Sequence, residues 1–363
     1  MITNPFALVP APVREFVKKH ERHVGTISIF TGFIWDSFTL VRPDQLYTNI
    51  VLLWYILVSA CGILLLTIYG KKGDFTPTIL LAIVQFAFGN LAGGFIVLYA
   101  RSGTLVGSFL FFLIFGAFLV GNEFLRTHYA RLNFHISAWY FLFVSYCALI
   151  FPIIVRQIGD GIFFASTIIS LLIVFVFLSL LYMTSPERVT GALKSSIFSI
   201  GTIFILFNSF YFLNIIPPVP LSIREIGVYH SVARLPNGNY QVVYEKPSWY
   251  EFLRSTDDIF TYVEGDSAYC FSSVFAPVRI STNIYHRWEH FNEKTGNWET
   301  VARIPFPIAG GRLEGYRGYT QKTNLLFGRY RCSVETHRGT LIGRTTFTVV
   351  EGEGIPFLSE KEI

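Results

Sequence analysis

The 363-residue sequence is short of charge: Asp, Glu, Lys and Arg together make up 15%, whereas hydrophobic residues make up 52% and Phe alone occurs 37 times. Soluble domains carry about 25% charged residues, so this composition excludes an ordinary soluble globular chain. A chain this apolar is typical of a membrane protein.

The sequence also lacks a secretory signal peptide, which combines a charged start, an apolar core of about 7 to 15 residues and a small-residue cleavage site. Residues 1–23 instead contain three prolines and four basic residues, and the apolar run after them leads directly into further apolar segments. We expect residues 1–23 to form a cytoplasmic tail.

Catalytic and cofactor motifs are missing as well. No Ser or Cys stands in the strand-turn-helix elbow that presents a nucleophile to a His and a carboxylate. The glycine-rich segment 310–319 lacks the Lys-Ser/Thr ending and the following helix of a phosphate-binding P-loop. We therefore predict no cofactor and no metal, and the pattern favours a protein that is not an enzyme.

What is present divides at Pro217, Pro218 and Pro220, where an apolar half gives way to a polar, turn-rich half. A hydrocarbon core about 30 Å thick needs about 20 apolar residues of helix to cross it. Seven segments meet this need, the first of them the weakest because it is short and contains Asp36: Val24–Val41, Tyr47–Tyr69, Phe75–Ala100, Thr104–Phe124, Phe134–Val155, Gly161–Met183 and Ser196–Ile216. We predict a seven-helix transmembrane domain over 24–216, then a Pro-rich linker over 217–224.

The basic residues of the connecting loops predict the orientation, because short cytoplasmic loops collect Lys and Arg. With the N-terminus inside, ten basic residues lie on the inner side: Arg14, Lys18, Lys19, Arg22, Lys71, Lys72, Arg126, Arg131, Arg188 and Lys194. Only Arg42, Arg101 and Arg156 lie outside. Seven crossings then place everything after Ile216 outside the cytoplasm, in the periplasm if this is a bacterial inner membrane. The formal charge of +5 belongs to these loops, so we predict no nucleic-acid partner.

Polar groups at membrane depth are candidates for function because they are costly there. Asp36, Asn90, Glu123 and Asn208 form this set, and Asp36, Asn90 or Asn208 would line the path if the bundle were a transporter or channel. The alternative is structural: interfacial ion pairs for the two carboxylates and interhelical hydrogen bonds for the two amides. Gly89 with Gly93 forms a small-residue spacing that suits either helix packing within the bundle or a homo-oligomer seam.

The polar half reads as antiparallel strands separated by turns. Three turns, each with a glycine, predict hairpins: Asn237-Gly238 before Tyr240–Glu245, Gly296-Asn297 between Ile284–Phe291 and Trp298–Ile304, and Arg338-Gly339 between Tyr330–Thr336 and Leu341–Val349. We predict an all-β sandwich over 225–351 and a C-terminal tail over 352–363.

Several motifs of this half resemble one family. They are CFSSVFAP (270–277), the strand around His286 and Trp288, FPIAGGR (306–312), GYRGYT (315–320) and GRTTFTV (343–349). Together they resemble the bacterial family called domain of unknown function 2914, in which such a β domain stands at the C-terminus, sometimes behind membrane helices. The family often has Trp where this chain has Tyr330. The resemblance implies a β domain at the bacterial envelope and no particular activity.

Two groups of residues are candidates for a ligand or partner surface. His286 and Trp288 share one face of a strand, where they form either part of an aromatic core or, if Trp288 is exposed, a stacking surface for a glycan. Arg312, Tyr316, Arg317 and Tyr319 lie in or beside the glycine-rich segment. Their arginines either fix a loop or bind an anionic ligand, a glycan or an acidic patch of an envelope protein.

Cys270 and Cys332 fall on predicted strands of a domain placed in an oxidising compartment, where a disulfide persists. Their spacing in space cannot be read from sequence, so the bond stays open here. The combined prediction is an inner-membrane protein with lipid as its solvent and a periplasmic binding or assembly module. A transporter or channel is the first alternative, and an enzyme acting on lipid or cell-wall material is the second.

Overall fold

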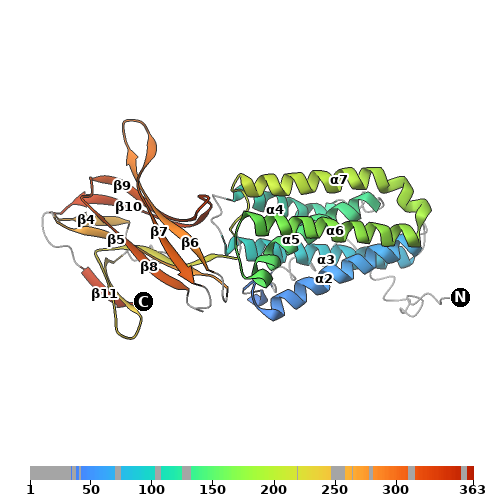
Figure 1. The fold of residues 1–363 in the computed structure, drawn as a ribbon, viewed down its shortest axis with the longest axis horizontal. Coiled ribbons are helices and arrows are strands. Elements are labelled where there is room, and N and C mark those ends of the chain that lie inside the picture. The colour runs from blue at the N-terminus through green and yellow to red at the C-terminus, as the bar shows by residue number, and fades with distance from the viewer. Residues whose placement is uncertain are drawn as a thin grey trace. The chain divides into compact units, whose positions relative to one another are not determined.

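A computed structural model describes residues 34, 38–40, 42–69, 75–102, 108–124, 132–218, 220–246, 258–263, 265–277, 281–309, 315–352 and 358–363. The chain forms a helical unit and a β unit, and the main division falls between Ile216 and Pro217 (Figure 1). The division therefore coincides with the proline break in the sequence.

The described residues of the helical unit contain six helices: α2 (Leu46–Tyr69), α3 (Phe75–Ala100), α4 (Phe109–Phe124), α5 (Leu132–Val155), α6 (Asp160–Thr184) and α7 (Pro186–Phe212). Five are long and apolar enough to cross a membrane, whereas α4 has 16 residues. The predicted count of seven is therefore not met among the described residues. The first predicted segment, 24–41, lies outside them except for residue 34 and residues 38–40.

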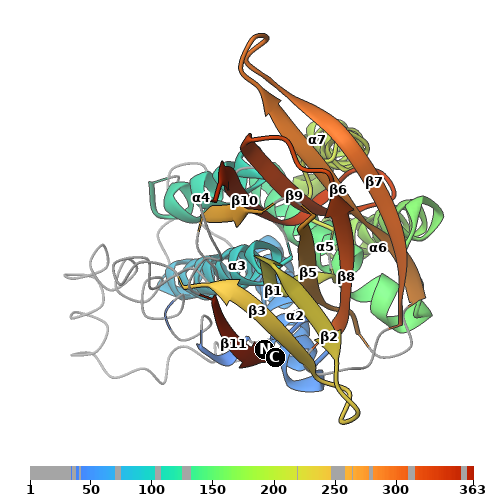
Figure 2. The same cartoon turned by 90° about the vertical axis from the view of Figure 1, so that its left-hand side faces the viewer.

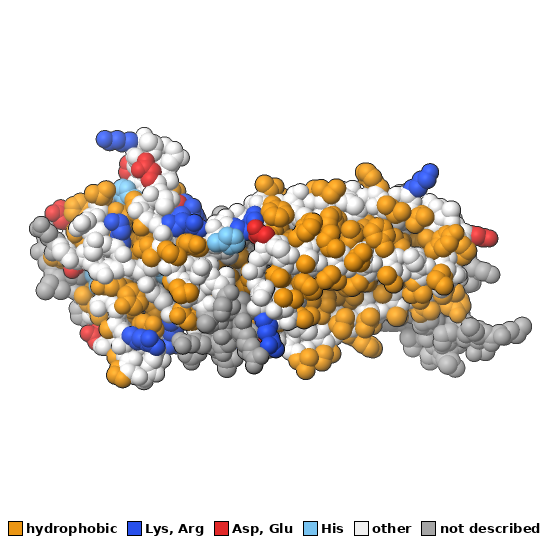
Figure 3. Space-filling view, viewed as in Figure 1, with side chains coloured by type: hydrophobic (Ala, Val, Ile, Leu, Met, Phe, Trp, Pro, Cys, Tyr) orange, Lys and Arg blue, Asp and Glu red, His pale blue; other side chains and the backbone are white. Residues whose placement is uncertain are grey.

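Hydrophobic side chains cover the visible face of this unit (Figure 3). Such a surface suits hydrocarbon, which cannot hydrogen-bond to polar groups. Inside, polar aromatic groups bond to backbone carbonyls of neighbouring helices: Tyr99 Oη of α3 donates to the Ser145 carbonyl of α5 at 3.0 Å, and Trp139 Nε1 of α5 donates to the Ile56 carbonyl of α2 at 3.2 Å. These bonds fix how the helices pack.

Helix α7 differs at both ends from the predicted span Ser196–Ile216. It begins at Pro186, which is well tolerated there because the first helical residues need no backbone N–H partner. It ends at Phe212, because Asn214 has a left-handed backbone (φ 58°) and the Ile215 amide bonds back to the Phe210 carbonyl at 2.8 Å. This is the Schellman arrangement, so the helix ends before the prolines are reached.

The described strands of the β unit are β1 (Ser222–Tyr229), β2 (Ser231–Arg234), β3 (Tyr240–Glu245), β4 (Ile259–Tyr262), β5 (Ser267–Phe275), β6 (Ser281–Asn292), β7 (Asn297–Ala309), β8 (Tyr316–Thr323), β9 (Gly328–Thr336), β10 (Leu341–Glu351) and β11 (Leu358–Glu362). They form sheets of order β1-β5-β8, β4-β10-β9-β6-β7 and β11-β3-β2. The three predicted hairpins are present as β2-β3, β6-β7 and β9-β10, with their glycines Gly238, Gly296 and Gly339 at positive φ.

The first two sheets face each other across a shared core and have features of an immunoglobulin-type sandwich. A disulfide joins Cys270 of β5 to Cys332 of β9, and therefore joins the two sheets. Trp288 of β6 is fully buried in the same core. Two residues before Cys332, the Tyr330 hydroxyl accepts a hydrogen bond from the Leu326 amide at 3.0 Å, which is the tyrosine-corner arrangement of that fold. Strand β4 pairs in parallel with β10, so one edge of the larger sheet is closed by a strand from early in the domain.

The third sheet covers the other side of β5 (Figure 2). Successive strand residues face opposite ways, so Phe271 packs with Val242 and Tyr229 in a second core while Cys270 faces the first. Residues 352–363 were predicted to be a tail, but Leu358–Glu362 form β11, which pairs with β3. Ser, Glu and Lys at the centre of this strand have low strand propensity, so the sequence did not predict it. Backbone pairing with β3 holds the segment in the extended conformation.

Candidate functional site

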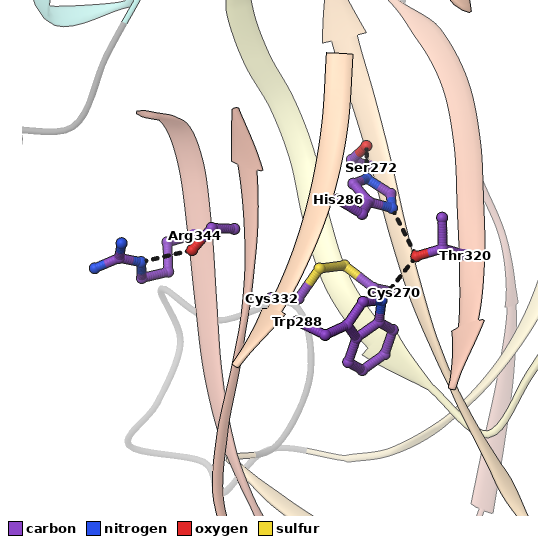
Figure 4. Close-up of a disulfide and its surroundings, with 8 residues drawn as sticks. Cys270, Ser272, His286, Trp288, Thr320, Cys332 and Arg344 are labelled. Atoms are coloured by element: carbon purple, nitrogen blue, oxygen red, sulfur yellow. Dashed lines mark hydrogen bonds between the residues drawn. A yellow bond between two sulfur atoms is a disulfide. The ribbon is translucent and has the colours of Figure 1, made fainter. Parts of the chain in front are cut away.

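The interior of the sandwich contains two of the predicted surface residues. His286 and Trp288 are both fully buried beside the disulfide (Figure 4). His286 Nε2 shares a hydrogen bond with Ser272 Oγ at 2.7 Å, and Thr320 Oγ1 lies 3.0 Å from both His286 Nδ1 and Trp288 Nε1. These residues form the hydrogen-bonded aromatic core that was the structural alternative, and they are not part of a ligand surface.

This core network has no access to a substrate. Burial lowers the pKa of His286 to about 3, so the imidazole is neutral at ordinary pH. Ser272 is as deeply buried as His286, and a nucleophile there could not reach a ligand. Ligand atoms of Cys270, His286 and Cys332 lie within 4.8 Å of one another, but the two sulfur atoms are bonded to each other. Cysteine binds a metal as the thiolate, so Cys270 and Cys332 cannot act as ligands while they are bonded to each other.

The second predicted group is only partly assembled. Tyr319 of β8 is 42% exposed and packs against the rings of Tyr240 and Tyr269. Arg317 is half-buried, and its Nη1 donates to Asn239 Oδ1 at 2.8 Å and to the Ile363 carbonyl at 3.3 Å. Arg317 therefore links β8 to the third sheet.

The remaining members of that group contribute less. Tyr316 is partly buried against the core around Val274, and Arg312 lies outside the described residues. Among the described residues of this group, Tyr319 is the one whose ring is exposed.

The two predicted intramembrane amides, Asn90 and Asn208, have internal hydrogen-bond partners. Asn90 and Asn208 are buried, and each side-chain amide donates to the carbonyl four residues earlier in its own helix. Asn208 Oδ1 also accepts from Thr167 Oγ1 at 3.2 Å, which links α7 to α6. Asp36 and the side chain of Glu123 lie outside the described residues. The side-chain amides of Asn90 and Asn208 therefore form local hydrogen bonds, and Asn208 forms an interhelical one as well.

The outward face of the five-stranded sheet carries a dense ion network that sequence reasoning did not single out. We call it the arginine face and define it by Arg287, Glu289, Arg303, Arg331, Glu335 and Arg344. Alternation places these residues outward on β6, β7, β9 and β10, because their neighbours in the chain point into the core. The two carboxylates are nearly fully buried under the arginines, with 3% and 1% of their residue surfaces exposed.

Two carboxylates hold three of the arginines. Arg331 makes a bidentate pair with Glu289, through Nε to Oε2 at 2.6 Å and Nη2 to Oε1 at 2.8 Å. Arg303 Nε donates to Glu335 Oε1 at 2.7 Å, and Arg287 Nε lies 3.0 Å from the other oxygen of Glu335. Burial alone would raise the pKa of Glu289, but the hydrogen bond from Arg331 and the neighbouring positive charges lower it below its ordinary value.

A bulge in β7 shapes one end of the arginine face. The register between β6 and β7 shifts after Trp288, so Glu289 pairs with Thr300 and Phe291 with Trp298. Strict alternation from Arg303 would turn Trp298 inward. Val301 is the extra, unpaired residue, and it shifts the alternation so that Trp298 points outward. The ring of Trp298 therefore lies against Arg331, whose guanidinium carbon is 4.4 Å from the ring centroid.

The sequence did contain a signal for this face. Arg287 and Glu289 on β6, like Arg331, Ser333 and Glu335 on β9, alternate in the sequence with apolar or aromatic residues, which the structure places in the core. A period-two row of charges on two neighbouring strands predicts cross-strand ion pairs. Strand order cannot be read from the sequence, so the pairing of β6 with β9 could not be predicted.

Together, the apolar helices and the β unit fit a membrane protein with a C-terminal β domain. Residues 281–349 match the model of a family described as Protein of unknown function (DUF2914), in agreement with the resemblance found in the sequence. This segment runs from β6 into β10 and includes every residue of the arginine face.

No curated protein matches the chain. Among solved structures, Pseudomonas fluorescens alkylpurine DNA glycosylase AlkC bound to DNA containing an abasic site analog is similar over 85% of this chain and 99% of that chain, with 10% identity and a TM-score of 0.21. A TM-score this low carries no inference about fold or function.

Proposed function

We propose that the chain is a bacterial inner-membrane protein that presents its β domain in the periplasm as a binding or assembly module. The Cys270–Cys332 disulfide carries this proposal, because a buried disulfide persists in an oxidising compartment and is rare in the cytoplasm. The excess of basic residues on the predicted inner loops supports the same orientation.

The outward arginine face and the exposed ring of Tyr319 are the surfaces on which a partner would bind. Both offer groups that interfaces favour, namely arginines and aromatic rings. The transporter alternative loses support because Asn90 and Asn208 are hydrogen-bonded inside the bundle. The enzyme alternative loses support because the Ser272–His286 pair is enclosed in the core.

Reporter fusions after Ile216 test the orientation. Alkaline phosphatase, which folds only outside the cytoplasm, should be active there, and a fusion in the loop after Tyr69 should be inactive. The opposite pattern would place the β domain in the cytoplasm and refute the proposal.

Thiol labelling tests the compartment independently. With Cys61 and Cys147 replaced by Ser, protein taken from acid-quenched cells and denatured should react with a maleimide only after reduction, because Cys270 and Cys332 are fully buried in the fold. Labelling without a reductant would show that Cys270 and Cys332 are free thiols in the cell.

Photo-crosslinking tests the binding function. A photoreactive residue in place of Val301, which is exposed on β7 beside the arginine face, should capture an envelope component. A photoreactive residue at Leu172, which is 61% exposed on the apolar helix α6, serves as the control and should capture lipid.

A further inference from the structure

The arginine face has a surplus of positive charge. Its four guanidinium groups face two carboxylates, so the arginine face, as the described residues define it, has a net charge of about +2. A surplus held in a partly buried site is costly, because like charges repel more strongly where water is excluded. Such a surplus is retained at little cost when an anion occupies the site.

Arg344 is the member without a carboxylate partner. Its Nε donates to Ser333 Oγ at 2.8 Å, and its terminal nitrogens have no hydrogen bond within the described residues. Figure 4 shows Arg344 on the opposite side of the strands from the disulfide, with these nitrogens pointing away from the sandwich. Burial, and then the positive charge of Arg331, lower the pKa of Arg344, which means that both destabilise its charged form.

Arg287 also has an unsatisfied donor. Its Nε lies 3.0 Å from Glu335 Oε2, but neither atom makes a hydrogen bond there, so the pair attracts by charge alone. Arg287 and Arg344 are both paired in register with Ser333 of β9, one from each side. The three residues therefore form one cross-strand row, with a hydroxyl between two guanidinium groups.

We propose that Arg344 and Arg287 bind a phosphate group, while the fully buried Ser333 between them holds Arg344 in position. A phosphate monoester carries about −1.5 to −2 charges at neutral pH and three strong acceptor oxygens, which matches a surplus of two positive charges. Arginine forks bind phosphate oxygens in pairs. A carboxylate supplies one negative charge and would leave half of the surplus. This inference rests on the proposed binding function and names its ligand.

Phosphate binding to the full-length protein in dodecyl maltoside, a phosphate-free detergent, tests the proposal by titration calorimetry. The probes are inorganic phosphate and glycerol phosphate, with acetate as the singly charged comparison. Phosphate should bind the natural protein, and Arg344→Gln should weaken binding by at least about tenfold. Ser333→Ala should weaken it less, because it removes a positioning hydroxyl and no charge.

Arg329→Gln is the matched control. Arg329 lies on β9 as well, but it is exposed, stacks on Phe291 and pairs with the exposed Glu293 at 3.5 Å. Phosphate affinity should be unchanged in this variant. Equal affinity in the natural protein and Arg344→Gln, or acetate binding as tightly as phosphate, would overturn the proposal. The melting temperature without phosphate shows that each variant is folded.

The source of the phosphate is tested by adding phosphatidylglycerol to the micelles. If a lipid headgroup is the ligand, the lipid should compete with glycerol phosphate in the natural protein, and a soluble phosphorylated ligand is indicated if it does not. Crosslinked partners that persist in Arg344→Gln, together with unchanged phosphate affinity, would refute the phosphate site and leave the proposed function standing.

Discussion

The two faces of the five-stranded sheet use the same strands for opposite chemistry. On β6, His286 and Trp288 point into a dry core, while Arg287 and Glu289 between and beside them point outward. On β9, Cys332 faces the same core. One residue step therefore separates a disulfide-linked interior from an ion network. We infer from this difference that the packed inner face stabilises the sheet on which the outer charges are held.

The strongest test of this comparison removes the disulfide. Replacing Cys270 and Cys332 with Ala should lower the free energy of unfolding of the β domain by about 4 kcal/mol, the chain-entropy value for a cross-link of this sequence separation. Urea denaturation followed by tryptophan fluorescence measures the loss. Cys61→Ala, at a free cysteine of α2, is the control. A loss below about 1 kcal/mol would show that the inner face does not depend on the cross-link.

The buried imidazole gives the inner face a dependence on pH. The pKa of His286 is lowered to about 3 in the folded protein, whereas an unfolded histidine titrates near about 6.5. The unfolded chain binds the extra proton, so stability is lost as pH falls below about 6.5. Between about pH 6.5 and pH 4.5 the free energy of unfolding should fall by up to about 1.4 kcal/mol per pH unit.

His286→Gln removes this titration and keeps an amide that can bond to Ser272 and Thr320. Its free energy of unfolding should change less over the same pH range. Parallel curves for the natural protein and the variant would contradict a neutral buried His286. The pKa of Glu289 is lowered, so the stability that this carboxylate adds is lost only below its usual value of about 4.3, outside that pH range.

A carboxylate removed from the outer face should have a smaller effect. Glu335→Gln leaves Arg303 without its anion and leaves Arg287 with only Glu289, at 3.7 Å. We expect a loss of about 1 to 2 kcal/mol, reduced by the partial exposure of both arginines. Urea denaturation measures this loss, and Glu293→Gln at an exposed pair should cost almost nothing. Equal losses in the two variants would mean that the outer network is an ordinary surface.

Arg344→Gln should change least. Without phosphate, its free energy of unfolding should stay within about 0.5 kcal/mol of the natural value, because the variant loses one hydrogen bond and relieves repulsion from Arg331. The same urea measurement checks this. A loss above about 2 kcal/mol would make Arg344 a structural member of the sheet and remove the contrast between the faces.

The sequence predicted the elements better than their contacts. Helices α2, α3, α5 and α6 agree with the predicted spans to within two residues at each end, because hydrophobic length alone defines them. Helix α7 was misplaced because its first turns are polar and because Asn214, rather than a proline, ends it. A hydropathy pattern carries no information about a left-handed residue such as Asn214 that ends a helix.

The site was harder to predict for a related reason. The sequence could treat Trp288 as core or surface, and only the pairing of β6 with β9 decided between them. The arginine face likewise depends on strand order and on the bulge that turns Trp298 outward. Both are properties of contacts between distant segments, which local alternation does not encode.

The parallel pairing of β4 with β10 has a consequence for the order of assembly. Ile259 pairs with Thr348, so β4 finds its neighbour only after most of the domain has been synthesised. Strand β3 pairs early with β2 but gains its second neighbour, β11, late, and Cys270 likewise meets Cys332 late. Pairings this distant in sequence slow folding. During synthesis, edges of the early strands therefore stay unpaired until β10 and β11 have been made. The complete sheets can form only after that point.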